Sequence, residues 1–307
     1  MNWKLTIVVL MLIAPFGVSA QTDTDEQLAA QYFKNGEFDK AEVYYQKLYK
    51  RYRDEFYYQY YIDCLLKLKN YTRAEKTVQK RIKKEDNPVL FVHLGHIYKT
   101  AGETKKSQQV FTKAVQELPP VQRQIDQLAN AFLDKGELEY VVRTYEKGRR
   151  LLNGLYNYRF ELANVYTRQG KMDLVFEEYL DALQEDESQV NKVKTELLEI
   201  MTDDPAGKRK EYFEEVVVGR IQRQPQRDIY PELLIWHYEQ QKQFNRAFTQ
   251  AKALDRRNRE DGARVVQLAH ICKANGSYDL AIEAYQYVIK KGRDSYYHYS
   301  CKKDLVN

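Results

Sequence analysis

Hydrophobic side chains recur three and four positions apart along most of the chain, which is the spacing of one face of an α-helix. Each apolar stripe stops at a short polar stretch, and a new stripe begins a few residues later. The 307 residues include only 13 Gly and 7 Pro, and 30% of them are charged. This pattern predicts an all-α chain of short helices joined by tight turns, with no sheet.

The stripes repeat in register. Leu28 and Ala29 begin one stripe that continues to Tyr32, Gly36 follows at the turn, and Ala41 lies in the next stripe. Small or branched residues equivalent to Ala41 recur at intervals of 33 or 34 residues, with one interval of 72. These residues are Ala41, Ala74, Ser107, Val141, Val175, Ala247 and Ala281. A fixed period of this length is the signature of a repeat protein.

Each position in the repeat has a physical role. Small residues in both stripes let two helices approach closely. Glycine at the turn adopts the positive φ that ends many helices, and it stands at Gly36, Gly102, Gly136, Gly170 and Gly276. One helix pair cannot bury both of its apolar faces, so neighbouring pairs must stack. The sequence therefore predicts a solenoid of helix pairs.

This pattern resembles the tetratricopeptide repeat, whose period is about 34 residues, over most of Glu26–Lys291. The resemblance implies a right-handed superhelix of antiparallel helix pairs. In two repeats the small residue and the glycine are both replaced, by Ile62 with Lys69 and by Ile235 with Lys242. We expect looser helix pairing in those two repeats.

The repeats divide the chain into five segments. These are a signal peptide at 1–20, five repeats in 21–187, a degenerate helix pair in 188–226, two repeats in 227–292, and a cap helix or the start of a further repeat in 293–307.

The first twenty residues are typical of a secretory signal. Lys4 is the only charge before Asp23, the chain from Leu5 to Phe16 is almost entirely apolar, and small residues precede Gln21, where we expect cleavage. The alternative is a membrane anchor, but this apolar stretch is shorter than the roughly 20 residues that span a bilayer. No later segment has a long uncharged run, so we expect no transmembrane segment after cleavage. A periplasmic location follows, or a secretory lumen or extracellular location in a eukaryote.

Charge and cysteine content exclude further classes. The formal net charge is +5, and the basic clusters are interleaved with acidic residues, so we expect no nucleic-acid partner. The three cysteines are widely spaced, and Cys64 and Cys272 lie on helix faces, where they act as small hydrophobic residues. Tyrosine is abundant, with 26 residues. In each tyrosine doublet only one ring can lie in the core of a repeat.

No catalytic motif is recognisable. The chain lacks a P-loop, a nucleophile elbow, a zinc-protease motif and a dinucleotide-binding turn. His93 and His96 form the only close histidine pair, and no third metal ligand lies nearby. Adjacent carboxylates such as Glu177 and Glu178 point apart on a helix, and we expect them to be solvated. We therefore expect a protein that is not an enzyme, with neither a metal nor a cofactor.

The resemblance implies that the first helix of each pair builds the inner wall of the solenoid. Counting back from each central small residue gives polar and aromatic candidates for a peptide-binding groove. They are Gln59, Asp63, His96, Lys99, Asp126, Asn130, Phe160, Asn164, Arg168, Trp236, Glu239, His270 and Lys273. Asn130 and Asn164 occupy equivalent positions one period apart, and an amide side chain can pair with both the donor and the acceptor of a peptide unit.

We expect a non-catalytic scaffold of the cell envelope that binds a protein or peptide. Family members that clamp the C-terminal carboxylate of chaperone tails use a lysine and an asparagine on one first helix. The lysine is missing from the corresponding positions here, so we expect no such tail binding. Two alternatives are a co-chaperone or assembly factor in a secretory lumen, and a sugar-binding accessory protein with Trp236 as its stacking platform.

Overall fold

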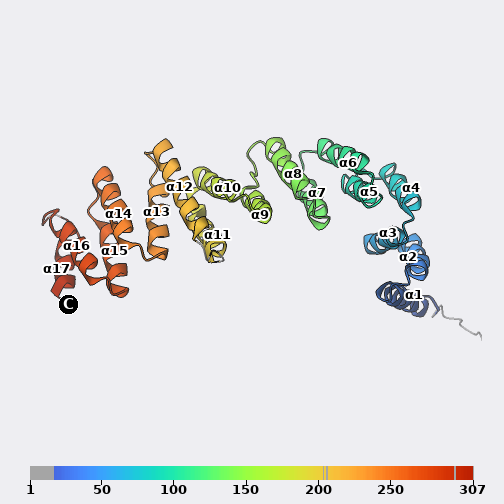
Figure 1. Cartoon of the computed structure of the whole chain (residues 1–307), viewed down its shortest axis with the longest axis horizontal. Helices are drawn as coiled ribbons and strands as arrows, with labels where there is room; N and C mark the ends of the chain where they lie inside the picture. The colour runs from blue at the N-terminus through green and yellow to red at the C-terminus, as the bar shows by residue number, and fades with distance from the viewer. Residues whose placement is uncertain (1–16, 203, 205–206, 294, 307) are drawn as a thin grey trace, which may run out of the picture. The chain divides into compact units, whose positions relative to one another are not determined.

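The computed structural model describes the backbone of residues 17–202, 204, 207–293 and 295–306. This described part contains seventeen α-helices and one 3-10 helix and no strand (Figure 1). The predicted all-α helical-repeat fold is therefore confirmed. The chain divides into two compact units, Met1–Leu155 (unit 1) and Tyr156–Asn307 (unit 2). The predicted signal peptide at 1–20 lies largely outside the described residues, and residues 17–20 belong to the first helix.

Unit 1 consists of four successive helix pairs (Figure 1). The pairs are α1 (Gly17–Lys34) with α2 (Phe38–Tyr52), α3 (Glu55–Lys67) with α4 (Tyr71–Ile82), α5 (Val89–Thr100) with α6 (Thr104–Gln116), and α7 (Gln122–Asp134) with α8 (Leu138–Leu151). Neighbouring pairs also touch, through α2 with α3, α4 with α5, α5 with α7 and α6 with α8. Each of α2 to α8 therefore contacts a helix of its own pair and a helix of a neighbouring pair.

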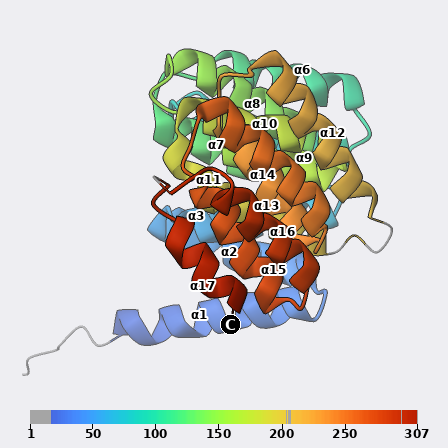
Figure 2. The same cartoon turned by 90° about the vertical axis from the view of Figure 1, so that its left-hand side faces the viewer.

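Unit 2 continues the same arrangement with one irregular pair. Its helices are α9 (Arg159–Gln169), α10 (Met172–Glu185), η1 (Glu187–Gln189), α11 (Val190–Thr202), α12 (Lys208–Arg223), α13 (Ile229–Gln240), α14 (Phe244–Asn258), α15 (Ala263–Ala274), α16 (Tyr278–Ile289) and α17 (His298–Val306). The last helix, α17, packs on α16 through the buried His298 and Cys301 (Figure 2). All three cysteines are buried and free, as expected of small core residues.

One backbone hydrogen bond closes the turn inside seven of the pairs. The N–H that follows the turn residue donates to the carbonyl five residues earlier, as Glu37 does to Tyr32 at 2.9 Å. The equivalent bonds run from Asn70 to Leu65, Glu103 to Tyr98, Glu137 to Phe132, Lys171 to Tyr166, Gln243 to Tyr238 and Ser277 to Cys272. The same turn forms whether glycine or lysine stands at its centre: Lys69 and Lys242 have φ of 57° and 56°. The geometry of the turn is therefore a property of the repeat and does not depend on glycine.

The expected looser pairing holds in one of the two divergent repeats. α3 and α4 touch over fewer residues than the other pairs of unit 1 do, whereas α13 and α14 pack as the regular pairs of unit 2 do. The prediction was thus wrong for the second divergent repeat. Ile235 is buried there between helices that still approach normally, so a larger side chain at this position does not by itself separate a pair.

The small residues of the pattern are all buried. The central position holds Ala41, Ala74, Ser107, Val141, Val175, Ala247 and Ala281, and none is more than 2% exposed. The first helix of a pair carries its own small residue at the facing position. These residues are Ala29, Ala129, Ala163 and Ala269, all 0% exposed, and the buried Gly95. A Cβ at Gly95 would overlap the ring carbons of Phe111. The α5–α6 pair is therefore packed so closely that an aromatic ring occupies the space of a methyl group.

A row of carboxylates on α10 is held by two arginines. Arg220 of α12, 6% exposed, binds Glu177 and donates to Asp181 at 2.8 Å. Arg159 of α9 pairs with Glu178 at 2.8 Å and with Asp181 at 3.0 Å. The expectation that Glu177 and Glu178 are simply solvated is therefore wrong. They do point apart, but each lies against a different neighbouring helix that supplies an arginine.

Candidate functional site

The helices α3, α5 and α7, which come first in three neighbouring pairs of unit 1, line two adjoining hollows that we call the inner groove. Gln59, His93 and Lys135 border both hollows. The first hollow is completed by Tyr58, Ile62, Asp63, Leu66 and His96, and the second by Glu55, Asn87, Val89, Gln127, Asn130, Ala131 and Asp134. The groove is thus built from three helices and from the turn that follows α7.

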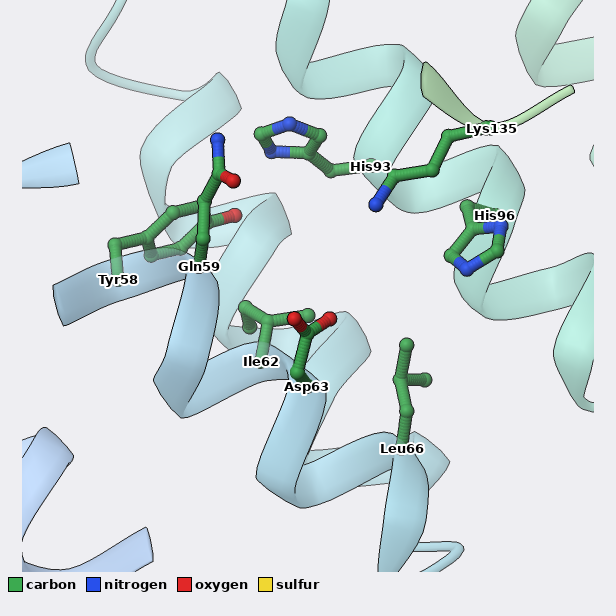
Figure 3. A pocket seen from close by; sticks show the side chains of 8 residues that line it. All are labelled: Tyr58, Gln59, Ile62, Asp63, Leu66, His93, His96 and Lys135. Atoms are coloured by element: carbon green, nitrogen blue, oxygen red, sulfur yellow. The ribbon is translucent and has the colours of Figure 1, made fainter. Parts of the chain in front are cut away.

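Opposite charges enter the first hollow from different elements. Asp63 projects from α3, and Lys135 extends from the turn after α7 to a point between His93 and His96 of α5 (Figure 3). In the described part of the chain no ion pair joins Lys135 to Asp63. Burial raises the pKa of Asp63, an effect that the Lys135 charge opposes. Neither side chain is taken up by an ion pair within the described part of the chain.

The two histidines are held in their neutral form. Burial lowers the pKa of His93 to about 3, and the nearby Lys135 and Arg81 charges lower it further. Burial also lowers the pKa of His96, and the nearby Lys135 charge lowers it further. A neutral imidazole has one donor and one acceptor nitrogen. At neutral pH the α5 wall of the hollow is thus polar but uncharged.

Two buried polar atoms in this hollow have no hydrogen-bond partner among the described atoms. They are the Tyr58 hydroxyl, on a side chain that is 0% exposed, and Nδ1 of His96. An unmatched buried polar atom costs free energy. The hollow is therefore suited to a group that both donates and accepts hydrogen bonds. No group of three His, Cys, Asp or Glu side chains in the described residues is placed to hold a metal ion.

Residues 90–117 match a family model described as a tetratricopeptide repeat. This segment spans α6 and all but the first residue of α5, and six further pairs share the turn hydrogen bond found between these two helices. By this match, residues 90–117 form a tetratricopeptide repeat.

Several solved tetratricopeptide repeat structures are similar to this chain at low identity. The domain of P58(IPK) is 12% identical, with 93% of this chain and 97% of that chain covered and a TM-score of 0.25. A repeat protein from Parabacteroides merdae is 13% identical, with coverages of 94% and 100% and a TM-score of 0.27. The C-terminal part of a repeat protein from Cytophaga hutchinsonii is 14% identical, with coverages of 90% and 98% and a TM-score of 0.29. No curated protein matches the chain.

Four of the predicted groove residues in unit 1 border the inner groove. They are Gln59, Asp63, His96 and Asn130. Lys99 instead forms an ion pair with Glu137 at 2.5 Å. Asp126 is half-buried and borders neither hollow. The structure therefore brings together the part of the set that lies on α3, the middle of α5 and the middle of α7.

The predicted residues of unit 2 are arranged around lysines of α11. Lys192 lies 3.5 Å above the ring of Phe160, and Lys194 lies 5.6 Å above the ring of Trp236. Burial raises the pKa of Glu239, and the positive charge of Lys194 opposes this increase.

The remaining candidates in unit 2 do not share one hollow. Asn164 and Arg168 are exposed on α9, and Lys273 is half-buried on α15. His270 is bonded to Asp304 of α17 at 3.2 Å.

The sequence analysis missed several residues of the inner groove and of the unit 2 contacts, for identifiable reasons. Lys135 lies in a turn and not on a first helix, so counting along helices could not find it. Tyr58 was recognisable only as half of a doublet. Lys192 and Lys194 belong to the degenerate pair, which has no central small residue from which to count. Besides the helix positions that gave Gln59, Asp63, His96 and Asn130, the His93–His96 spacing was a further signal, and it identified two residues of the α5 wall.

Acid should destabilise unit 1 through His93. Its pKa is about 3 in the folded protein against an ordinary value of 6.5, so below pH 6.5 the unfolded chain takes up a proton that the folded chain does not. The stabilisation present above pH 6.5 is lost as the pH falls toward 3, by roughly 2 kcal/mol at pH 5. Urea denaturation at pH 7 and pH 5 measures this loss. The His93→Gln variant should lose less stability between these pH values, because it has no imidazole to protonate at this position. An unchanged pH dependence in His93→Gln would contradict the assignment.

Proposed function

We propose that this protein is a non-catalytic scaffold that binds an extended segment of a partner protein in the inner groove of unit 1. The observation that carries the proposal is the first hollow, where Tyr58 and His96 each leave a buried polar atom unmatched beside Lys135 and Asp63. Tetratricopeptide repeats are generally protein-binding scaffolds, and this groove has unfilled hydrogen-bonding capacity.

The chemistry of the groove favours a neutral polar side chain on the partner. A carboxylate would approach Asp63, and an ammonium group would approach Lys135, so a full charge of either sign meets a like charge. A carboxamide instead offers an acceptor to Lys135 and a donor to Asp63. Ile62 and Leu66 border the same hollow and can contact the apolar stem of such a side chain. We therefore propose Asn or Gln as the anchor residue of the bound segment.

The partner's main chain has its own contacts in the second hollow. The amides of Gln59 and Asn130 are both exposed and stand on different helices, α3 and α7. Each amide can donate to and accept from one peptide unit. Two such contacts would hold an extended segment across α5 without any requirement on its sequence.

A randomised peptide library screened against the full chain tests this proposal. We expect selected peptides to carry Asn or Gln at one fixed position. The double variant Gln59→Ala/Asn130→Ala should weaken their binding roughly tenfold, because each lost hydrogen bond contributes about 0.5–1.5 kcal/mol. Titration calorimetry or fluorescence anisotropy gives the Kd.

Asn164→Ala is the matched control. Asn164 occupies the position on α9 that Asn130 occupies on α7, and it is exposed but borders neither hollow of the inner groove. Its variant should bind the selected peptides as the wild type does. Failure to select any peptide, or equal losses in the control and in the double variant, would contradict binding in the inner groove.

The compartment is a proposal as well. The charge-poor apolar stretch from Leu5 to Phe16 followed by small residues supports export, and we propose the periplasm. No helix in the described residues is long and apolar enough to cross a membrane. Binding of sugar by Trp236 has no additional support, since Lys194 already lies over its ring.

A further inference from the structure

A second groove in unit 1 lies between α2 and α4 and shares no residue with the inner groove. We call it the basic groove. Its border consists of Gln46, Tyr49, Lys50, Arg53, Tyr61, Arg73, Lys76, Thr77, Lys80, Arg81, Lys84 and Glu85. Seven of these side chains are basic and one is acidic. The whole chain has 49 basic and 44 acidic residues, so this local excess is not a consequence of composition.

Two of the seven basic side chains are neutralised. Arg73 pairs with Glu42 at 3.0 Å, and Arg81 pairs with Glu55 at 2.8 Å and with Glu85 at 2.6 Å. Within the described chain no ion pair reaches the other five, which are Lys50, Arg53, Lys76, Lys80 and Lys84. All five are exposed. The groove therefore presents five positive charges without a carboxylate of their own.

Three of these charges form a row. Lys76, Lys80 and Lys84 are spaced four residues apart, and Lys76 and Lys80 belong to α4. Like charges at this spacing on a helix repel each other and destabilise it. A bound anionic chain would remove this repulsion, since each lysine would gain a carboxylate. The repulsion and the missing partners both point to a polyanionic ligand.

The aromatic rings of the groove distinguish between kinds of polyanion. Arg53 lies over the ring of Tyr49, and Arg73 lies over the ring of Tyr61, which is also buried and bonded to Gln46. Rings covered in this way cannot stack on nucleic-acid bases. Such stacking is the usual source of affinity for single-stranded nucleic acid. No exposed large apolar side chain borders the groove to enter a bilayer.

We propose that the basic groove is a second docking surface, which binds an extended acidic segment of a protein. Glu and Asp side chains on such a segment can reach the lysine row on α4 and Lys50 with Arg53 on the α2 side at the same time. Gln46 and Thr77 also border the groove. Gln46 is bonded to Tyr61 and Lys50, and the Thr77 hydroxyl donates to the Arg73 carbonyl, so the oxygen of each side chain keeps room to accept a hydrogen bond from the main chain of the segment. This proposal is independent of the inner groove, because the two surfaces have no residue in common.

Binding of a labelled oligoglutamate peptide to the full chain tests the proposal by fluorescence anisotropy. We expect binding that weakens as salt is added, because exposed charges are screened. Lys76→Glu/Lys80→Glu should weaken binding at least roughly tenfold, since two attractions become repulsions. The neutral variant Lys76→Gln/Lys80→Gln should show a smaller loss in the same direction, and circular dichroism confirms that both variants are folded.

The control is Lys105→Glu/Lys171→Glu, which changes the net charge equally at exposed positions outside both grooves. It should retain the wild-type Kd within about twofold, as should Gln59→Ala/Asn130→Ala. Equal losses in the Lys105/Lys171 control would show a long-range charge effect and overturn the proposal. Absence of oligoglutamate binding would overturn it too. The proposal would also be overturned if a single-stranded oligonucleotide or phosphatidylserine vesicles bound more tightly than oligoglutamate and lost this binding in Lys76→Glu/Lys80→Glu.

Discussion

Replacing Phe111 with Ala should cost about 3–5 kcal/mol of the free energy of unfolding, the range for emptying a fully buried aromatic site. Phe111 is 1% exposed, and its ring lies edge-on to Phe132 at 5.3 Å and near Tyr140 at 5.1 Å. These three rings belong to α6, α7 and α8, so the cavity would open between two pairs. Urea denaturation followed by circular dichroism measures the loss.

Two further variants show whether the loss comes from this packing. Phe56→Ala removes the same ring from a site that is 58% exposed and should cost less than about 1.5 kcal/mol. Gly95→Ala should itself destabilise by about 1–3 kcal/mol, because its methyl group would overlap Phe111. In the Phe111→Ala background the same methyl group enters the cavity, so the two costs should not add. Additive costs would contradict the close approach of α5 and α6.

Replacing Arg220 with Ala should destabilise unit 2 by about 3 kcal/mol. Removing one partner of a buried ion pair typically costs about 3–5 kcal/mol of the free energy of unfolding. We expect the low end of this range for Arg220, because the side chains of Glu177 and Asp181 are 37% and 33% exposed. Without the guanidinium these two carboxylates, one turn apart on α10, keep only Arg223 and Arg159 as ion-pair partners. Denaturation curves at pH 7 give the change.

Arg223→Ala is the matched comparison. Arg223 also reaches Glu177, at 3.2 Å, but is 61% exposed, so its removal should cost less than about 1 kcal/mol. The Arg220→Met variant keeps the packing of the side chain and should recover part of the loss. If Arg220→Ala and Arg223→Ala cost the same, the buried position of Arg220 contributes nothing.

The repeat could be predicted from sequence because close packing restricts residue size at a few positions. Ala41 and its equivalents must be small, so their period is visible in one chain. Where both Gly and the small residue were replaced, as at Lys69 and Ile62, the second-helix Ala74 still gave the register. Three tyrosine doublets each have one buried ring, at Tyr45, Tyr58 and Tyr61, whereas the doublet of Tyr296 and Tyr297 has none.

The grooves were less predictable because they combine residues without a shared period. Asn130 was found by its helix position, but Lys135 reaches the same groove from a turn. The basic groove needed the fold to bring α2 beside α4, since Lys50 and Lys80 are distant in sequence. Along the chain acidic residues flank the lysine run, at Glu75 and Glu85. In the structure the acids either turn away or are taken up by Arg73 and Arg81.

The turns at Lys69 and Lys242 show that the chain is less stable than its own repeat pattern permits. A left-handed backbone costs a residue with a Cβ about 1–2 kcal/mol that glycine avoids. Five equivalent turns use glycine, and these two exposed lysines border neither groove. They offer two places where an engineer could strengthen the protein without altering either binding surface.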